Sequence, residues 1–280
     1  MRILLQSIQS SAARYGRYIH PLISVSVDFY VRLFMLVFSG KKEAKSTASK
    51  LSMVYQCVNC HTLSWQPLMT TDGANKFIRG GGPPTSSSCQ FCRSRQNLGG
   101  PIWSAPIHDP EFVASLLDSL DDDSLGSLKT EKRIRGILSV IHEELPDIPL
   151  FYGYDRMASF LKLSCPSLIE FRSAILNAGY RVSLSHCYKH SVKTDAPPAV
   201  LWDILLTIAR KVLPKKTWPH SLPEKPLPSD YLLSREISTE VNLEQHIDAN
   251  PESRKQKLVR FQANPEKHWG PKARAKPSNR

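Results

Sequence analysis

Two short cysteine pairs constrain this 280-residue chain more than any other feature. Cys57 and Cys60 form one C-x2-C motif, and Cys89 and Cys92 form a second one further along the chain. Each motif can present two thiolates from one tight turn, so together they supply the four sulfurs of a tetrahedral metal site. Because every ligand would be a protein atom, the spacing predicts a closed, structural zinc site. Free thiols or a redox pair are the alternatives.

The positive charge of the chain is concentrated at its two ends. The whole chain has 37 basic and 25 acidic side chains, a net charge of +12. Residues 1–50 contain 8 basic and 2 acidic side chains, residues 51–249 contain 20 and 21, and residues 250–280 contain 9 and 2. Clustered Lys and Arg favour contact with a phosphate backbone, which predicts a nucleic-acid partner. A solvated basic tail is the alternative for the C-terminal cluster.

The N-terminal region does not have the pattern of a membrane or secreted protein. The apolar run at Ile3, Leu4 and Leu5 is too short for a signal peptide. The segment 19–38 is apolar, but Asp28 and Arg32 would lie near the middle of a bilayer at a cost of a few kcal/mol each. We therefore expect a strand pair or a core helix there, and no membrane partner.

Local patterns predict an α+β fold. The β-branched and aromatic run 25–38 predicts a central strand, and residues 53–57 predict a second strand that leads into the first cysteine pair. Asp109 as N-cap and Pro110 at N1 begin the first of several amphipathic helices. The expected helices are 109–120, 131–145, 154–161, 166–178 and 199–212, with strands at 180–185 and 191–194.

The order of helix, helix and basic hairpin within residues 109–212 is that of a winged helix. Alternation along the hairpin places Arg181, Ser183, Ser185 and Lys193 on a polar face, and we predict that this face contacts RNA. Five prolines between Pro214 and Pro228 predict an extended linker, residues 213–248, without a regular core.

A basic segment at residues 249–280 supplies a second set of predicted RNA contacts. Asn250 and Pro251 predict the start of a helix that runs to Gln262. Aromatic rings among cations can pair base stacking with phosphate contacts. Alternatively, the two aromatic rings attach the tail to the globular part. The predicted contacts are Arg254, Lys257, Arg260, Phe261 and Trp269.

The sequence contains no recognisable catalytic motif. A Gly-rich nucleotide turn after a strand, a P-loop and a Ser nucleophile elbow are all missing from the pattern, so no catalytic residue is assigned. The nine histidines lie at spacings that build neither a triad nor an open metal site. Cys165 and Cys187 have no neighbours at ligand spacing and receive no role.

Several motifs then occur in order along nearly the whole chain. Together they resemble the tRNA (guanine(26)-N2)-dimethyltransferases of eukaryotes and archaea. The resembling segments are residues 21–38, the four cysteines, 99–103, 106–109, 133–136, 166–174, 181–186, 192–197, 260–265 and 269–271.

This resemblance implies a function in tRNA modification. Members of the family use S-adenosylmethionine to methylate the exocyclic N2 amine of guanosine 26 in tRNA twice, so the implied partners are tRNA and this methyl donor, with no other small-molecule substrate. The implied fold is a class I methyltransferase sheet followed by a family-specific C-terminal domain. The implied regions are 1–56 as closing strands of the sheet, 57–108 as the zinc region, 109–212 as a winged-helix-like domain, then the linker and the basic tail.

The family's donor-binding glycine motif and its catalytic Asp-Pro segment are not matched by residues of this chain. We therefore expect the chain to correspond to the C-terminal part of the enzyme, to lack the donor site and to be inactive alone. Asp28, Tyr30 and Arg32 lie in a family segment near the edge of the substrate pocket, and they are candidate substrate contacts. Alternatively, they form a buried polar group that stabilises the last strands.

Two other readings of the chain compete with the enzyme. The first is a non-enzymatic RNA-binding module or an inactive truncated isoform, built from the zinc site, the winged helix and the tail. The second is a fragment that does not fold because its sheet has an unpaired edge. The basic residues from Lys272 to Arg280 are compatible with nuclear import. We expect the nucleus, with the cytoplasm and the mitochondrion as alternatives.

Overall fold

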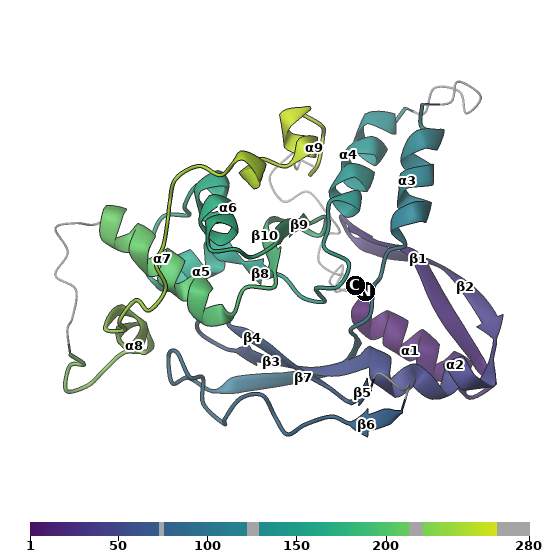
Figure 1. Cartoon of the computed structure of the whole chain (residues 1–280), viewed down its shortest axis with the longest axis horizontal. Helices are drawn as coiled ribbons and strands as arrows, with labels where there is room; N and C mark the ends of the chain where they lie inside the picture. The colour runs from purple at the N-terminus through teal and green to yellow at the C-terminus, as the bar shows by residue number, and fades with distance from the viewer. Residues whose placement is uncertain (73–75, 122–128, 213–220, 262–280) are drawn as a thin grey trace, which may run out of the picture.

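The computed structural model describes residues 1–72, 76–121, 129–212 and 221–261. These residues form a mixed α and β architecture of small antiparallel sheets with helices packed against them (Figure 1). This confirms the predicted mixture of helices and strands. Within the described ranges, no helix has the length and apolar character needed to cross a membrane.

The N-terminal region is a helix packed on a β-hairpin. The elements are α1 (Arg2–Ala13), β1 (Arg17–Val27), β2 (Tyr30–Ser39), α2 (Lys41–Lys45) and a 3-10 turn at Ser46–Lys50. Leu5 of α1 is fully buried against Ile19 of β1. The predicted single central strand at 25–38 is wrong, because the chain reverses at Asp28, whose φ of 52° lies in the left-handed region typical of turns. The expectation of a strand pair over residues 19–38 is confirmed.

The cysteine region is a second antiparallel sheet with the strand order β4-β3-β7. The predicted strand at 53–57 is confirmed as β3, and the first cysteine pair lies where β3 turns into β4. The sheet consists of β3 (Leu51–Cys57), β4 (Leu63–Pro67) and β7 (Gln96–Trp103), and β5 (Met69–Thr71) and β6 (Phe77–Arg79) pair in a separate two-stranded sheet.

A helical pair, α3 (Pro110–Ser119) and α4 (Glu131–His142), stands over β1 (Figure 1). The predicted start of α3 is confirmed, because the Asp109 carboxylate accepts a hydrogen bond from the Phe112 backbone N–H at 3.0 Å. Val113 and Leu138 bury their side chains against Ile23 of β1. This contact places the start of the C-terminal region directly on the N-terminal hairpin.

The largest core lies in the C-terminal region and includes the cysteines. Trp202 and Phe171 are fully buried there, in one cluster with Cys57 and Cys92. The strand order is β8-β10-β9, and all pairings are antiparallel. The elements are β8 (Tyr152–Gly153), α5 (Tyr154–Phe160), α6 (Leu168–Asn177), β9 (Val182–Ser185), β10 (Tyr188–Thr194) and α7 (Pro198–Val212).

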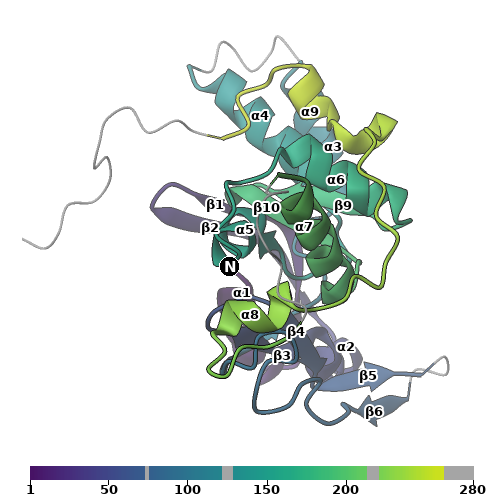
Figure 2. The ribbon, with the colours of Figure 1, turned by 90° about the vertical axis from the view of Figure 1, so that its left-hand side faces the viewer.

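The segment after α7 departs from two expectations. The linker was predicted to lack a core, but α8 (Pro228–Leu233) buries Leu232 and Leu233 against the main core. The basic helix predicted for 251–262 is reduced to α9 (Glu252–Lys255), after a 3-10 turn at Ile247–Ala249. Figure 2 shows α9 beside α4, on the opposite side of the molecule from β5 and β6. Trp269 and the rest of 262–280 lie outside the described residues.

Candidate metal centre and polar pocket

The structure brings the four predicted zinc ligands together. The Sγ atoms of Cys57 and Cys92 are 3.3 Å apart, and those of Cys60 and Cys89 are 3.6 Å apart. All four ligand atoms lie within 4.8 Å of one another, and all four residues are buried. The two turns that carry them are tied by the backbone, because Val58 N donates to Arg95 O at 3.3 Å.

These sulfurs fit a tetrahedral zinc ion. Zn–S bonds of about 2.3 Å place neighbouring sulfurs about 3.8 Å apart, close to the separations found here. Hydrogen bonds among the four thiols lower the pKa of Cys57 and Cys92 and raise the pKa of Cys60 and Cys89, as expected for closely packed thiols that share their protons. Thr62 Oγ1 lies 3.1 Å from the Cys60 sulfur and accepts a hydrogen bond from Trp202 Nε1 at 3.0 Å. This outer contact links the cysteine turns to α7.

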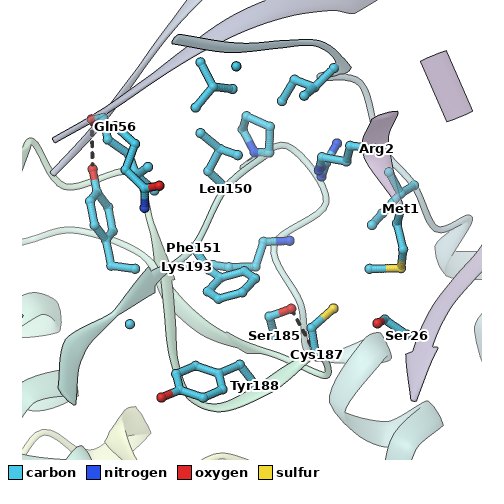
Figure 3. A pocket seen from close by; sticks show the side chains of 18 of the residues that line it. Met1, Arg2, Ser26, Gln56, Leu150, Phe151, Ser185, Cys187, Tyr188 and Lys193 are labelled. Atoms are coloured by element: carbon cyan, nitrogen blue, oxygen red, sulfur yellow. Dashed lines mark hydrogen bonds between the residues drawn. The ribbon is translucent and has the colours of Figure 1, made fainter. Parts of the chain in front are cut away.

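A pocket of about 680 Å³ lies between α1, the β3–β7 sheet and the β8–β10 sheet. Figure 3 shows the ammonium end of Lys193 and the guanidinium of Arg2 in its interior, with Phe151, Tyr188 and Cys187 below them. The lining therefore combines cations with aromatic and aliphatic side chains from both halves of the chain.

Glu144 is the centre of a buried polar network beside this pocket. Its Oε1 accepts hydrogen bonds from the His186 backbone N–H at 2.7 Å and lies 2.6 Å from His186 Nδ1, and its Oε2 accepts from Lys193 Nζ at 3.0 Å. Burial raises the pKa of Glu144, but the hydrogen bond from His186 and the charge of Lys193 outweigh it and lower the pKa to about 2. The carboxylate is thus ionised at neutral pH.

The network extends into the N-terminal region. Ser26 N on β1 donates to His186 Nε2 at 3.1 Å, and the His108 ring lies edge-on to the His186 ring with centroids 5.4 Å apart. Burial lowers the pKa of His108 to about 3, so this ring is neutral. His108, Glu144 and His186 are groups of a kind that binds metals, but Lys193 occupies one carboxylate oxygen and would repel a cation. We therefore treat the group as a structural network that joins the two regions.

The structure changes the predicted RNA face of the hairpin. Ser183, Ser185 and Lys193 are buried, with only 3–4% of their surfaces exposed. Ser183 Oγ accepts from Leu145 N at 3.0 Å, and Ser185 N donates to Ser191 Oγ at 2.7 Å. These three residues were predicted to face RNA, but they face the interior because the segment after α4, with Glu144 and Leu145, packs against the hairpin.

Arg181 is the one member of that predicted face which is exposed. Its Nη2 lies 2.6 Å from Asp147 Oδ2, and its Nε lies 2.7 Å from Asp195 Oδ2. Two carboxylates thus neutralise this guanidinium. A phosphate would have to compete with both of them for Arg181.

The C-terminal arginines turn partly inward. The Nη1 atoms of Arg172, Arg254 and Arg260 are buried, and they have no hydrogen-bond partner among the described residues. Arg172 Nε donates to Ala249 O at 2.7 Å, which holds the segment before α9 on α6. Lys257 is exposed, and Phe261 is half-buried under the Arg260 guanidinium at 5.8 Å. Of this predicted set, Lys257 is the most open to a partner.

The predicted substrate contacts Asp28, Tyr30 and Arg32 lie together at the tip of the β1–β2 hairpin. The Arg32 guanidinium lies 5.4 Å from the centre of the Tyr30 ring, and Asp28 Oδ2 pairs with Arg133 Nη2 of α4 at 2.5 Å. Tyr30 and Arg32 are exposed, so they are not the buried polar group considered as an alternative. None of the three lines the pocket in Figure 3.

The described residues do not form a cradle for S-adenosylmethionine. Every strand pairing among them is antiparallel, and no Gly-rich turn there connects a parallel strand to a helix. No step of a methyl transfer is therefore derived from these residues. The pocket and the network carried no signal in the sequence, since their members come from segments as far apart as Arg2 and Lys193.

Comparisons with known proteins place the chain among tRNA methyltransferases. The family model for N2,N2-dimethylguanosine tRNA methyltransferase matches residues 1–206. A tRNA (guanine(26)-N(2))-dimethyltransferase of Drosophila melanogaster is 48% identical over an alignment of 286 positions, which covers 98% of this chain and 48% of that protein. The protein of the same name from Homo sapiens is 43% identical over an alignment of 290 positions, which covers 100% of this chain and 42% of that protein.

Two further relatives extend this comparison. A Saccharomyces cerevisiae relative, named as mitochondrial, is 33% identical over 98% of this chain and 51% of that protein. The complex structure of Trm1 from Pyrococcus horikoshii with S-adenosyl-L-methionine superposes with a TM-score of 0.57 and 26% identity, covering 72% of this chain and 48% of that one.

The chain thus spans about half the length of the relatives that it matches. The comparisons do not support the narrower expectations that the chain is only a C-terminal part and is inactive alone, because they match nearly all of it to the family. They give no support to a non-enzymatic module either. The chain belongs to the N2,N2-dimethylguanosine tRNA methyltransferase family.

Proposed function

We propose that the chain acts in the methylation of N2 of guanosine 26 in tRNA, with S-adenosylmethionine as the methyl donor. The observation that carries this proposal is the match of relatives named for this reaction along 98–100% of the chain. A second support is the related structure from Pyrococcus horikoshii, which was solved with S-adenosyl-L-methionine. Addition of two methyl groups is part of the proposal, since the matching relatives are named dimethyltransferases.

Within this reaction, we assign the described residues two tasks. The first is to hold a structural zinc ion with the four cysteines, which lie in the largest core and join β3, β7 and α7. The second is to contact tRNA. The element order α4, β8, α5, α6, β9 and β10, with a three-stranded antiparallel sheet, supports a winged-helix-like unit, and residues 1–56 fit the closing strands of a class I methyltransferase sheet.

For RNA contacts outside the pocket, the exposed Lys257 and the hairpin tip with Tyr30 and Arg32 are the proposed residues. They are exposed, and at the hairpin tip the Arg32 guanidinium lies beside the Tyr30 ring, which pairs a cation with an aromatic ring. Arg181, Arg254, Arg260 and Phe261 are secondary, because ion pairs or packing already engage them. We place the protein in the nucleus on the basic residues 272–280, with the mitochondrion as the alternative suggested by the yeast relative.

The test is binding and methyl transfer measured in the same samples. The purified, zinc-loaded chain is titrated with transcribed tRNA and with duplex DNA over a salt series, and labelled donor is added to each mixture. We expect tRNA to bind more tightly than DNA, with an affinity that falls steeply with salt. A tRNA with adenosine in place of guanosine 26 is the matched substrate control, and label should enter only the guanosine form. Equal affinity for tRNA and DNA would refute the tRNA assignment.

A further inference from the structure

The pocket between the two regions has more positive than negative charge. Two cations that are at least partly buried, Arg2 and Lys193, line it together with the exposed Arg156, whereas Glu144 is the one carboxylate among its described lining residues. Glu144 is already bonded to His186 and to Lys193. A buried excess of cations is costly unless an anion compensates it. The charge of this lining therefore indicates a negatively charged occupant.

The cations also have hydrogen-bond donors to spare. Arg2 donates twice from Nη1, to Trp103 O at 2.8 Å and to Ala105 O at 2.9 Å, and these bonds fix the orientation of its guanidinium. Its Nε and Nη2 make no hydrogen bond to any described residue, and neither atom is a fully buried polar atom without a partner. Lys193 makes one hydrogen bond and has three N–H donors. Donors held in place but unused are suited to a phosphate group.

The remaining wall suits a flat ring. Phe151 and Tyr188 stack with centroids 6.4 Å apart, and both line the pocket together with Leu150. Figure 3 shows these rings on the same side of the view as Cys187, below the charged ends of Arg2 and Lys193. A volume of about 680 Å³ lies within the range of sites that enclose small ligands, and it exceeds the needs of one phosphate. Phosphate donors beside aromatic rings are the pattern of single-stranded RNA sites.

We propose that this pocket receives one unpaired nucleotide of the tRNA, with its phosphate at Arg2 and Lys193 and its base against Phe151 and Tyr188. The inference rests on the proposed function, because it takes tRNA as the partner. It explains both the free edge of Arg2 and the cavity, neither of which the structural role of the Glu144 network requires. It also gives Lys193 an RNA contact from within the pocket, in place of the solvent-facing role that alternation predicted.

Two cysteines outside the metal centre make the test specific. Cys187 is half-buried, lines the pocket, and directs its sulfur toward the interior in Figure 3. Cys165 is exposed and is not a lining residue, so it serves as an internal control in the same molecule. The four remaining cysteines are buried in the metal centre.

The experiment measures the rate of maleimide labelling of both thiols in the zinc-loaded chain, with and without saturating tRNA. We expect tRNA to slow labelling of Cys187 at least about fivefold and to leave Cys165 unchanged, as expected for a contact that excludes water. In parallel, Cys187→Asp should weaken tRNA binding about tenfold because it adds a negative charge beside the phosphate. Cys165→Asp should leave the affinity unchanged.

The outcomes separate this inference from the proposed function. If tRNA still binds in preference to DNA while Cys187 labels at the free rate and Cys187→Asp binds normally, the pocket inference is overturned and the tRNA assignment stands. If the chain shows no preference for tRNA, both are overturned. Labelling in the unsubstituted chain does not depend on how the variant folds, so a variant that fails to fold leaves the first measurement decisive.

Discussion

Replacement of Glu144 by glutamine tests whether the buried network holds the two regions together. Glutamine keeps the size of the side chain but removes its charge. In the parent protein, the Glu144 carboxylate accepts from His186 N, lies against His186 Nδ1 and accepts from Lys193 Nζ, at 2.7, 2.6 and 3.0 Å. The variant would leave Lys193 as a buried cation without its counter-ion. We therefore expect a large loss of stability from a nearly isosteric change.

Two arguments give the size of this loss of stability, one from the pKa of Glu144 and one from buried ion pairs in other proteins. The pKa of Glu144 falls from 4.5 to about 2 in the fold. At about 1.4 kcal/mol per pKa unit, that shift corresponds to roughly 3 kcal/mol of stabilisation of the ionised form. Removal of one partner from a buried ion pair costs about 3–5 kcal/mol in other proteins. Burial lowers the pKa of Lys193, so loss of its proton limits the penalty and favours the lower end of this range.

The penalty should depend on pH with a defined sign. The folded pKa of Glu144 lies below its unfolded value of 4.5, so its contribution is complete above pH 4.5 and is lost as the pH falls toward 2. Between pH 7 and pH 6, where the Glu144 carboxylate stays ionised, its contribution should therefore be constant. His108 has a folded pKa of about 3, below its usual 6.5, and destabilises the fold on acidification. The charge of Glu144 raises the pKa of His108 and helps to raise the pKa of His186, so the variant also loses the stability that Glu144 gives to these protonated rings.

Urea unfolding of the zinc-loaded parent and variant at pH 7 measures the penalty, because acid protonates the cysteine thiolates and would release the zinc at pH 3.5. Glu240→Gln is the matched control, because Glu240 is exposed and its loss should change the unfolding free energy by less than about 0.5 kcal/mol. A Glu144→Gln variant as stable as this control at pH 7 would show that the network does not join the two regions.

Three further changes test other contacts. Removal of zinc by a chelator should unfold the largest core, because the four cysteines are part of it. Native mass spectrometry should find one zinc ion per chain before this treatment. A chain that stays folded without metal would contradict the zinc site. Gly136→Ala should destabilise the packing of residues 258–260 by about 1–3 kcal/mol, because the new Cβ would lie 2.1 Å from Val259 O. Gly81→Ala is the control, because its Cβ would meet open space and should not change stability. Equal rates of proteolysis for the two variants would refute this prediction. Glu143→Gln should lower the stability of the packing of α9 by roughly 1–3 kcal/mol, because Glu143 accepts hydrogen bonds from Ser253 N at 2.6 Å and from Ser253 Oγ at 2.7 Å. Unchanged hydrogen exchange at the backbone amides of α9 would contradict this prediction.

The sequence was most informative where the signal is local. Asp109 and Pro110 predicted the start of α3, and the cap hydrogen bond at 3.0 Å confirms it. The cysteine spacing predicted a cluster that the structure brings together, because ligand chemistry is encoded in two short turns. The turn at Asp28 was missed, since the apolar run continues through it and only the left-handed φ of 52° reveals the reversal. A run of β-branched residues predicts strands without giving their ends.

The hairpin face shows why polar alternation did not identify a binding surface. Ser183, Ser185 and Lys193 alternate with apolar residues, and alternation of this kind usually places the polar set in solvent. Here the polar segment that follows α4 covers them: Leu145 N donates to Ser183 Oγ, and Glu144 supplies the counter-ion for Lys193. Two polar surfaces that form hydrogen bonds with each other show the same alternation of polar and apolar residues in the sequence as two surfaces that face water. Only the three-dimensional structure distinguishes these two cases. It places Lys193 at the wall of a pocket inside the molecule, together with the hydrogen-bond donors of Arg2, and not on the outer surface.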